Sequence, residues 1–265
     1  QDFFGHPFFY NGKSMKYYDM VISLGQNCHA SMVLRNCSQQ QFSYPLDWSA
    51  GILWDKCGVA GLPGKVELIC NNFQGAFERE DFVVFGEPDP DSPHFWVKNL
   101  KTGLQYQHDF PKGKTVDEYF PVFKEKYRRR VYRLYEEIGR SERVLFFFIS
   151  YTDELTDDIV ILCHNRLTNR FSDKKIDFML IMKDDSVDIG TYHRIDINKN
   201  IVKYNVDIGH YLYSDDCIKN KNTVFAVVNN HFVTASKINN MFDMLWKQQS
   251  EIELLKDKLN KSVHE

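Results

Sequence analysis

The sequence predicts an α/β fold, namely a three-layer Rossmann-like domain with a mostly parallel sheet and a β-hairpin insertion. Short, nearly continuous apolar runs alternate with longer helical patterns along the chain, which is the order of βαβ units. Strands buried on both faces of a sheet produce such continuous runs. The run at residues 21–24 also ends in a glycine turn that leads directly into a helical pattern. These observations favour parallel strands joined by helices.

The first half of the chain predicts short strands and one short helix. Residues 17–24 predict the first strand, and residues 28–36 predict the helix that follows it. A stretch rich in Gly and Pro at residues 58–64 predicts a break. Residues 82–85 predict another strand, and two apolar triplets around a Lys-Thr-Gly turn predict a hairpin at residues 95–106.

The second half alternates more regularly between the two kinds of element. Apolar residues recur at helical spacing over residues 116–138, which predicts a long helix with one buried stripe. The other expected helices cover residues 153–167 and 235–261. The expected strands cover residues 143–149, 176–182, 192–197 and 223–228, and residues 183–190 and 198–222 predict loops.

Length and composition are those of an ordinary globular protein. The chain has 265 residues, of which 43% are hydrophobic and 26% charged, so it can form a sizeable core. We expect residues 1–16 to be an N-terminal extension, residues 17–235 the α/β domain with its hairpin insertion at about 80–110, and residues 236–265 an amphipathic helix. The net charge of −3 argues against a nucleic-acid partner.

Cysteine usage points to a reducing compartment. The six cysteines form no C-x-x-C pair and match no zinc spacing, so we expect free thiols, no metal and no cofactor. A secretory signal pattern is missing from the first residues, which favours a cytoplasmic protein. Because no apolar run reaches about 18 residues, we expect no membrane span.

Cys28 is the strongest candidate for a reactive residue. It follows the predicted first strand and lies in the first turn of the predicted helix, where unpaired backbone N–H groups and the helix dipole favour a thiolate. A thiolate at the carboxyl end of a strand is well placed for nucleophilic chemistry. The alternative is a buried cysteine that serves only in packing.

A nucleophilic cysteine needs a base, and histidine is the best candidate near neutral pH. His108 lies in a polar turn after the predicted hairpin, and Asp109 follows it directly and could orient its ring. His210 is the second choice because an Asp three residues earlier is a spacing found in α/β hydrolases. His29 diverges from Cys28 by about 100° on a helix, which makes it a poor base. Asn27 could hold an oxyanion or cap the helix.

Other residues are candidates for binding a ligand. Clustered basic side chains on the long helix suit a phosphate or sugar-phosphate, although such a run is often only a solvated face. The turn before the first helix lacks the second and third glycines of a dinucleotide fingerprint. The candidate ligand-binding residues are Gly25, Gln26, His29, Asp47, Trp48, Lys126, Arg129 and Arg130.

The final helical pattern leaves two interpretations open. Apolar residues near a 3.5-residue spacing either pack on the sheet or form a short coiled coil. They are Ile238, Met241, Leu245, Ile252, Leu255 and Leu259. A homodimer through this helix is therefore one hypothesis.

Four segments together resemble the bacterial and viral family of papain-like cysteine peptidases of unknown function. They are residues 23–35, 43–48, 108–110 and 123–130, and Leu46 stands where the family has Phe. The resemblance implies a nucleophile at Cys28 and a histidine at His108, with Asp109 or Asp47 nearby. It also implies a setting among surface-polysaccharide genes. The Gly-Gln-Asn-Cys turn is similar in plan to that of esterase-like capsule-biosynthesis proteins, which would imply acyl transfer to a glycan.

We therefore expect a cysteine-dependent hydrolase or acyl transferase that acts on a small-molecule, glycan or peptide substrate. One alternative is a non-catalytic module that binds a phosphorylated sugar or nucleotide-like ligand through the Asn27 turn and the basic helix. The other is an interaction protein that dimerises through its final helix.

Overall fold

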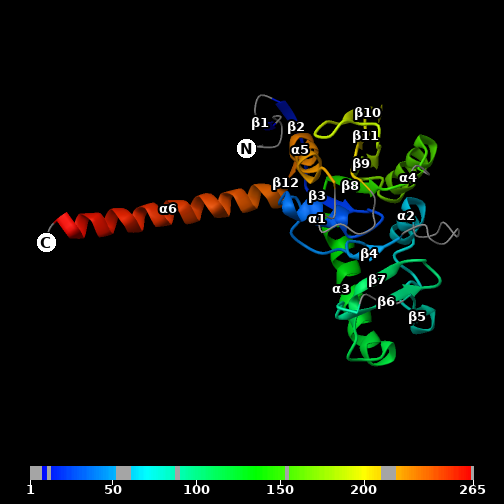
Figure 1. Cartoon of the computed structure of the whole chain (residues 1–265). Helices are drawn as coiled ribbons and strands as arrows, with labels where there is room; N and C mark the ends of the chain where they lie inside the picture. The colour runs from blue at the N-terminus through cyan, green and yellow to red at the C-terminus, as the bar shows by residue number, and fades with distance from the viewer. Residues whose placement is uncertain are drawn as a thin grey trace.

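The computed structural model describes residues 8–10, 13–51, 61–86, 90–152, 155–209 and 219–263. These residues form helices together with three sheets, two of which contain parallel strands (Figure 1). The α/β class expected from the sequence is therefore confirmed at this level.

The largest described sheet has five strands in the order β10-β11-β9-β8-β3. Its parallel strands are β3 (Met20–Ser23), β8 (Arg143–Ser150), β9 (Lys175–Lys183) and β11 (Ile201–Val206). The edge strand β10 (His193–Asn198) pairs antiparallel with β11. The parallel strands follow one another in sequence order without a reversal, so this order does not establish the Rossmann-like arrangement, which remains a prediction.

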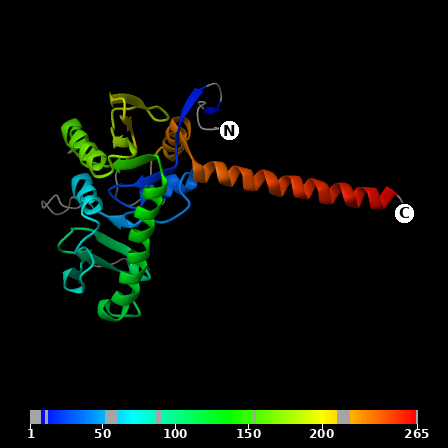
Figure 2. The same ribbon diagram turned by 180° about the vertical axis from the view of Figure 1, so that it is seen from behind.

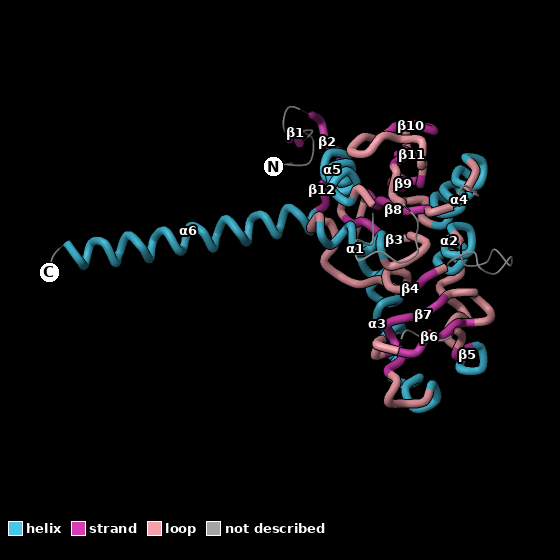
Figure 3. The backbone as a smooth tube through the Cα atoms, viewed as in Figure 1, coloured by secondary structure: helices cyan, strands magenta, loops and turns pink. Residues whose placement is uncertain are grey.

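Strand β8 shows how the sheet separates two apolar cores. Its side chains alternate, so that Phe146 packs into one core and Phe147 into the other, as the two-residue period of a strand requires. One core contains residues of α2 (Leu62–Cys70), α3 (Val116–Arg140) and α4 (Asp157–Arg170). The other contains residues of α1 (His29–Asn36) and α5 (Lys221–His231). Figure 3 shows these helices distributed around the magenta strands.

A second sheet extends the first core. Its four antiparallel strands are β4 (Ser49–Ala50), β7 (Gln105–Pro111), β6 (His94–Asn99) and β5 (Phe82–Val84), and a short turn, η1 (Arg79–Asp81), leads into β5. Helix α3 packs against this sheet through aromatic contacts such as Phe110 with Phe123, whose ring centroids are 4.8 Å apart. The same helix contributes Leu134 and Ile138 beside the parallel sheet, so α3 connects the two sheets.

The third sheet joins the two ends of the described chain. It contains β1 (Phe8–Tyr10), β2 (Lys13–Tyr18) and β12 (Phe232–Thr234), and β12 pairs parallel with β2. Helix α6 (Ala235–Val263) follows β12 directly. In both views it extends away from the rest of the molecule (Figures 1 and 2).

Several expected elements are wrong in detail. Residues 223–228, expected as a strand, lie in α5, where Val224, Val227 and Val228 form one buried helical face. Residues 198–222, expected as a loop, contain β11.

Two further corrections affect the region of the site. The expected first strand is divided at Asp19, because its carboxylate accepts hydrogen bonds from the backbone N–H groups of Glu142 and Arg143, each at 2.8 Å. His108 and Asp109 lie within β7 rather than in a turn after it.

Candidate functional site

Cys28 lies where the sequence predicts, beyond the carboxyl end of β3 and at the start of α1. After Ser23 the chain continues beside β8, and the backbone N–H of Gln26 donates to the carbonyl of Ile149 at 3.2 Å. Cys28 is the residue that precedes α1, and its side chain is partly exposed. The sulfur is therefore at the edge of the sheet where ligands bind in open α/β proteins.

Glycine and glutamine fix the turn that carries Cys28. A Cβ at Gly25 would collide with the Cβ of Ala30, so only glycine allows α1 to fold back this closely. The Gln26 carboxamide accepts from the N–H of Tyr151 at 2.7 Å and donates to the Thr152 hydroxyl at 3.0 Å. Gln26 thereby ties the turn to the end of β8, and both of its polar ends are occupied.

The residues on either side of Cys28 are bonded to each other. The side-chain oxygen of Asn27 accepts from the N–H of His29 at 2.8 Å, which caps the first turn of α1. The His29 ring nitrogen Nδ1 lies 2.6 Å from the Tyr151 hydroxyl and 3.3 Å from the amide nitrogen of Asn27. Burial lowers the pKa of His29 to about 4, so this imidazole is neutral at physiological pH.

Lys65, which is not among the candidates predicted from the sequence, is a buried lysine beside this turn. Lys65 is completely buried on α2, and its ammonium donates to the carbonyl oxygen of Gly25. Burial lowers the pKa of Lys65 to about 7, although the negative charges of Asp47 and of ionised Cys28 oppose this shift. The amine and the sulfur are therefore electrostatically coupled.

A helical pattern around Lys65 is the signal that could have identified it. The lysine lies among apolar residues at helical spacing, on a face with Leu62, Val66 and Ile69. A lysine on such a face is rarely buried unless it has partners. The Gly and Pro residues at 58–64 predict a break, although α2 begins within this stretch at Leu62.

Asp47 is a second fully buried charged residue of the region. One of its oxygens, Oδ2, accepts from the Gln40 side chain at 2.8 Å and from the N–H of Tyr44 at 2.7 Å. The other, Oδ1, has no hydrogen-bond partner among the residues that the structure describes. Burial raises the pKa of Asp47 to about 7, while Arg35 and Arg130 favour its charged form.

His108 lies beside Trp48 rather than in a free turn. The two rings meet edge to face with centroids 6.3 Å apart, because β4, directly after Trp48, pairs with β7. The Arg35 guanidinium lies over the Trp48 ring, 5.7 Å from its centre. His108 is exposed, yet desolvation lowers its pKa, with smaller contributions from His94 and Lys126, while the negative charge of Asp109 opposes the shift. That the His108 ring reaches the Cys28 thiol stays a prediction.

Asp109 makes contacts that join β7 to α3. Its buried carboxylate binds the ammonium of Lys126 and accepts from the Tyr127 hydroxyl at 2.9 Å. The register between β6 and β7 is irregular at this point, as at a β-bulge, which redirects side chains. Both carboxylate oxygens of Asp109 therefore bind side chains of α3. Orientation of the His108 ring by Asp109 stays a prediction.

The three basic candidates of α3 do not share one partner. Lys126 binds Asp109, whereas Arg129 is largely exposed and lies 3.9 Å from Glu125. Arg130 lies over the Tyr127 ring at 5.0 Å and is close enough to favour the charged form of Asp47. His210 is outside the described residues.

In the described part of the chain, no group of three or more His, Cys, Asp or Glu side chains is arranged to hold a metal ion. Within the same residues, no helix combines the length and apolar character needed to cross a membrane.

Comparison with known proteins gives a family. The family described as "Putative papain-like cysteine peptidase (DUF1796)" matches residues 19–186, a range that contains Cys28, Lys65 and His108 and more than half of the chain. No curated protein and no solved structure matches the chain. The chain therefore belongs to this family of putative papain-like cysteine peptidases.

Proposed function

We propose that this protein is a cysteine-dependent hydrolase that cleaves an acyl bond of the peptide type, with Cys28 as nucleophile. The observation that carries the proposal is the position of Cys28, partly exposed at the first turn of α1 and charge-coupled to the buried amine of Lys65. Membership of a family of papain-like cysteine peptidases supports the same chemistry.

Lys65 is the proposed acceptor of the thiol proton. With a pKa of about 7, its amine can be neutral at physiological pH, take the proton of Cys28 and leave a thiolate beside an ammonium. The thiolate then attacks the substrate carbonyl carbon, and a C–S bond forms as the carbonyl oxygen becomes an oxyanion. Backbone N–H groups in the first turn of α1, other than that of His29, which already donates to Asn27, are the proposed donors to that oxyanion.

The remaining steps release both products. The tetrahedral intermediate collapses, the bond to the leaving amine breaks, and the amine departs with the proton that the Lys65 ammonium returns. Water then hydrolyses the thioester, giving a carboxylic acid and restoring the thiol. His108 is the alternative proton carrier for either step, because its lowered pKa keeps it neutral near pH 7 and therefore able to accept a proton.

A burst experiment tests the proposal. Mixing the full chain with p-nitrophenyl acetate should give a burst of p-nitrophenol and an acetyl group on Cys28, detected by mass spectrometry of peptides. Cys28→Ala should lose both. Cys70→Ser is the matched control and should keep both signals. Cys70 is also partly exposed, but burial raises the pKa of its thiol. A burst that survives in Cys28→Ala, or acetylation of Cys70 instead, would contradict the proposal.

Two finer parts of the proposal concern the acceptor and the scaffold. Transfer of the acyl group from Cys28 to a sugar hydroxyl instead of to water would make the protein an acyl transferase of surface polysaccharide. Product analysis with and without a glycan acceptor distinguishes transfer from hydrolysis.

The five-stranded sheet would serve as a three-layer Rossmann-like scaffold within residues 17–235, and the β4–β7 region as an insertion into it.

A further inference from the structure

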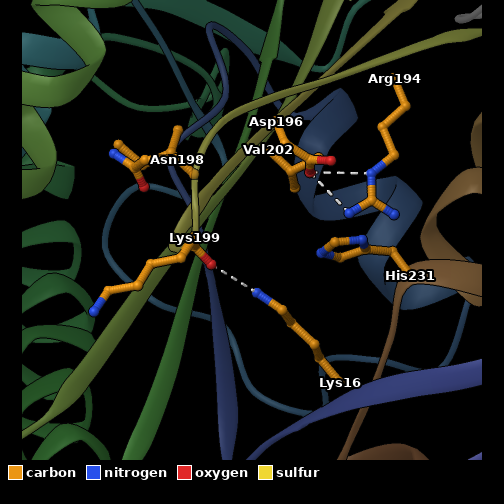
Figure 4. A pocket seen from close by; sticks show the side chains of 8 residues that line it. Lys16, Arg194, Asp196, Asn198, Lys199, Val202 and His231 are labelled. Carbon is orange, nitrogen blue, oxygen red and sulfur yellow. Dashed lines mark hydrogen bonds and ion pairs between the residues drawn. The ribbon is translucent and has the colours of Figure 1, made fainter.

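A cavity of about 400 Å³ lies at the opposite end of the sheet from Cys28. It is near the amino end of β11, whose first residue Ile201 pairs with Phe178, whereas Cys28 follows the carboxyl end of β3. The lining residues are Lys16, Arg194, Asp196, Asn198, Lys199, Ile201, Val202 and His231 (Figure 4). The cavity is therefore separate from the candidate active site.

Lys16 is held in place at this cavity. Its ammonium donates to the Asp177 carboxylate at 3.1 Å and to the carbonyl oxygen of Lys199 at 3.3 Å. The same carboxylate oxygen of Asp177 accepts from the Tyr18 hydroxyl at 2.6 Å. An ammonium has three N–H donors, so one remains for a ligand while the other two fix the side chain.

Arg194 is also fixed by a carboxylate. Its Nε and Nη2 atoms donate to one oxygen of Asp196 at 3.1 and 2.8 Å. A guanidinium has five N–H donors, so this bond orients the group and leaves donors on its other edge. Figure 4 shows the guanidinium beside the ring of His231.

His231 adds an uncharged ring nitrogen. Its Nδ1 lies 2.9 Å from the Tyr204 hydroxyl, which leaves Nε2 for a ligand; Nε2–H donates when the Tyr204 hydroxyl donates to Nδ1. Burial, with the positive charges of Lys16 and Arg194, lowers the pKa of His231 to about 4, although the carboxylates of Asp177 and Asp196 oppose this shift. The ring and the two cations line the same cavity.

The balance of charge indicates the ligand class. The cations Lys16, Arg194 and Lys199 line the cavity against the carboxylate of Asp196 and the Asp177 carboxylate bound to Lys16, so a net positive charge remains, which favours an anion. A phosphate group offers several strong acceptor oxygens in different directions, which suits donors that come from three separate elements, β2, β10 and α5. Ile201 and Val202 add an apolar wall for an organic part. We propose that this cavity binds the phosphate group of a small phosphorylated molecule through Lys16, Arg194 and His231.

Titration calorimetry of the full chain with inorganic phosphate tests this site. Lys16→Gln and Arg194→Gln should each weaken phosphate binding by about tenfold, since each removes one charge-assisted donor. Lys203→Gln is the matched control, because this lysine lies on β11 but binds Asp157 of α4 at 2.6 Å. No binding by the wild type, or equal binding by all three variants, would overturn the proposal.

A second readout guards against variants that do not fold. In the wild type, phosphate should move the ring resonances of His231 and raise the pH at which they titrate, because a dianion favours the protonated ring. Unmoved His231 resonances in saturating phosphate would overturn the site. The esterase burst of Cys28 should be unchanged in these variants, so failure here is distinguishable from failure of the proposed function.

Helix α6 carries an independent second inference. Many of its large apolar side chains are exposed, including Leu245 at 58%, Ile252 at 46% and Leu255 at 63%. A solitary helix with such a surface is marginal in water, and contiguous exposed apolar surface marks an interaction site.

The spacing on α6 identifies the partner. Ile238, Leu245 and Ile252 occupy one heptad position, and Met241 and Leu255 occupy the other apolar position together with the polar Gln248. Ile238 and Ile252 at the first position, with Leu255 at the second, are the residues of this pattern that favour two parallel strands. Glu251 and Lys256 fall at the positions that lie opposite each other in a parallel pair. We infer that α6 binds α6 of a second copy of this chain as a parallel coiled coil.

Light scattering on the full chain tests the pairing. The wild type should have the mass of a dimer, and Leu245→Glu combined with Ile252→Glu should have the mass of a monomer. Trp246→Glu is the matched control, since Trp246 is 73% exposed but lies outside the two apolar heptad positions. A monomeric wild type, or a control that dissociates as readily, would overturn the inference.

The orientation of the pair has its own test. Gln248→Cys should form a disulfide-linked dimer on mild oxidation, because residues at this heptad position face each other in a parallel pair. Ser250→Cys, on the outer face, should not. Equal cross-linking of both variants would contradict a parallel pair in register.

Discussion

Burial changes the charge states of three side chains around Cys28. It raises the pKa of Asp47 to about 7, lowers that of Lys65 to about 7 and lowers that of His29 to about 4. His29 is therefore fixed as a neutral hydrogen-bonding group, whereas Lys65 and Asp47 both exchange protons close to physiological pH. At the residue scale, these charge states support the proposed transfer of the thiol proton to Lys65 rather than to the adjacent imidazole.

The buried His29 makes stability depend on acid pH. Its pKa is about 4 in the folded protein against about 6.5 in an unfolded chain, so the unfolded state binds more protons between these values. Its contribution is complete above about pH 6.5 and is lost as the pH falls towards 4, by up to about 3 kcal/mol.

Urea denaturation of the wild type and of His29→Asn measures this contribution. The difference between their free energies of unfolding should shrink by up to about 3 kcal/mol as the pH falls from about 6.5 to 4. Asparagine retains an amide group near the position of Nδ1 but cannot titrate. A difference that stays constant over this range would contradict the assignment of His29 as a buried neutral group.

At the scale of elements, α3 holds the two sheets together, and its first turn is stabilised by a capping box. The Thr115 hydroxyl accepts from the N–H of Glu118 at 3.2 Å, and the Glu118 carboxylate accepts from the N–H of Thr115 at 2.7 Å. Thr115→Ala should lower the free energy of unfolding by about 1 kcal/mol. Thr115→Ser retains the hydroxyl and should restore most of the loss, and equal losses in both variants would contradict a capping role.

Local pattern was sufficient to predict some elements and not others. The long stripe of α3 and the apolar runs of β8 and β9 were predicted because burial on one or both faces leaves an unambiguous period. Residues 223–228 were mistaken for a strand because the β-branched valines of α5 suit both structures. Val224, Val227 and Val228 are buried on one face of α5, against strands of the sheet that lie far away in the sequence. This long-range packing stabilises the helix and is invisible to a local pattern.

At the scale of the whole molecule, the candidate site assembles from distant parts of the sequence. The turn around Cys28 was predicted because strand, glycine and helix follow one another locally. Lys65 of α2 and Tyr151 after β8 reach the same turn only through packing. No local pattern places these residues together, which is why the buried amine was missed and the partner of the thiol was sought among the histidines.

The projecting helix should be separable from the folded body. A chain that ends after residue 240 loses the exposed apolar residues of α6, which contact little of the rest. The shortened chain should therefore be monomeric. It should keep the urea midpoint and the Cys28 reactivity of the monomeric variant that combines Leu245→Glu with Ile252→Glu. A large fall in the midpoint would show instead that α6 packs on the body.

The rate at which iodoacetamide alkylates Cys28, followed by peptide mass spectrometry as a function of pH, tests the coupling to Lys65 most directly. At about pH 6.5, Cys28 should react at least about tenfold faster than Cys70 in the wild type, and Lys65→Met should remove this advantage while His108→Ala leaves it intact. If Lys65→Met folds normally and alkylates with the wild-type pH profile, the buried amine does not ionise the thiol, and the account of this site is wrong.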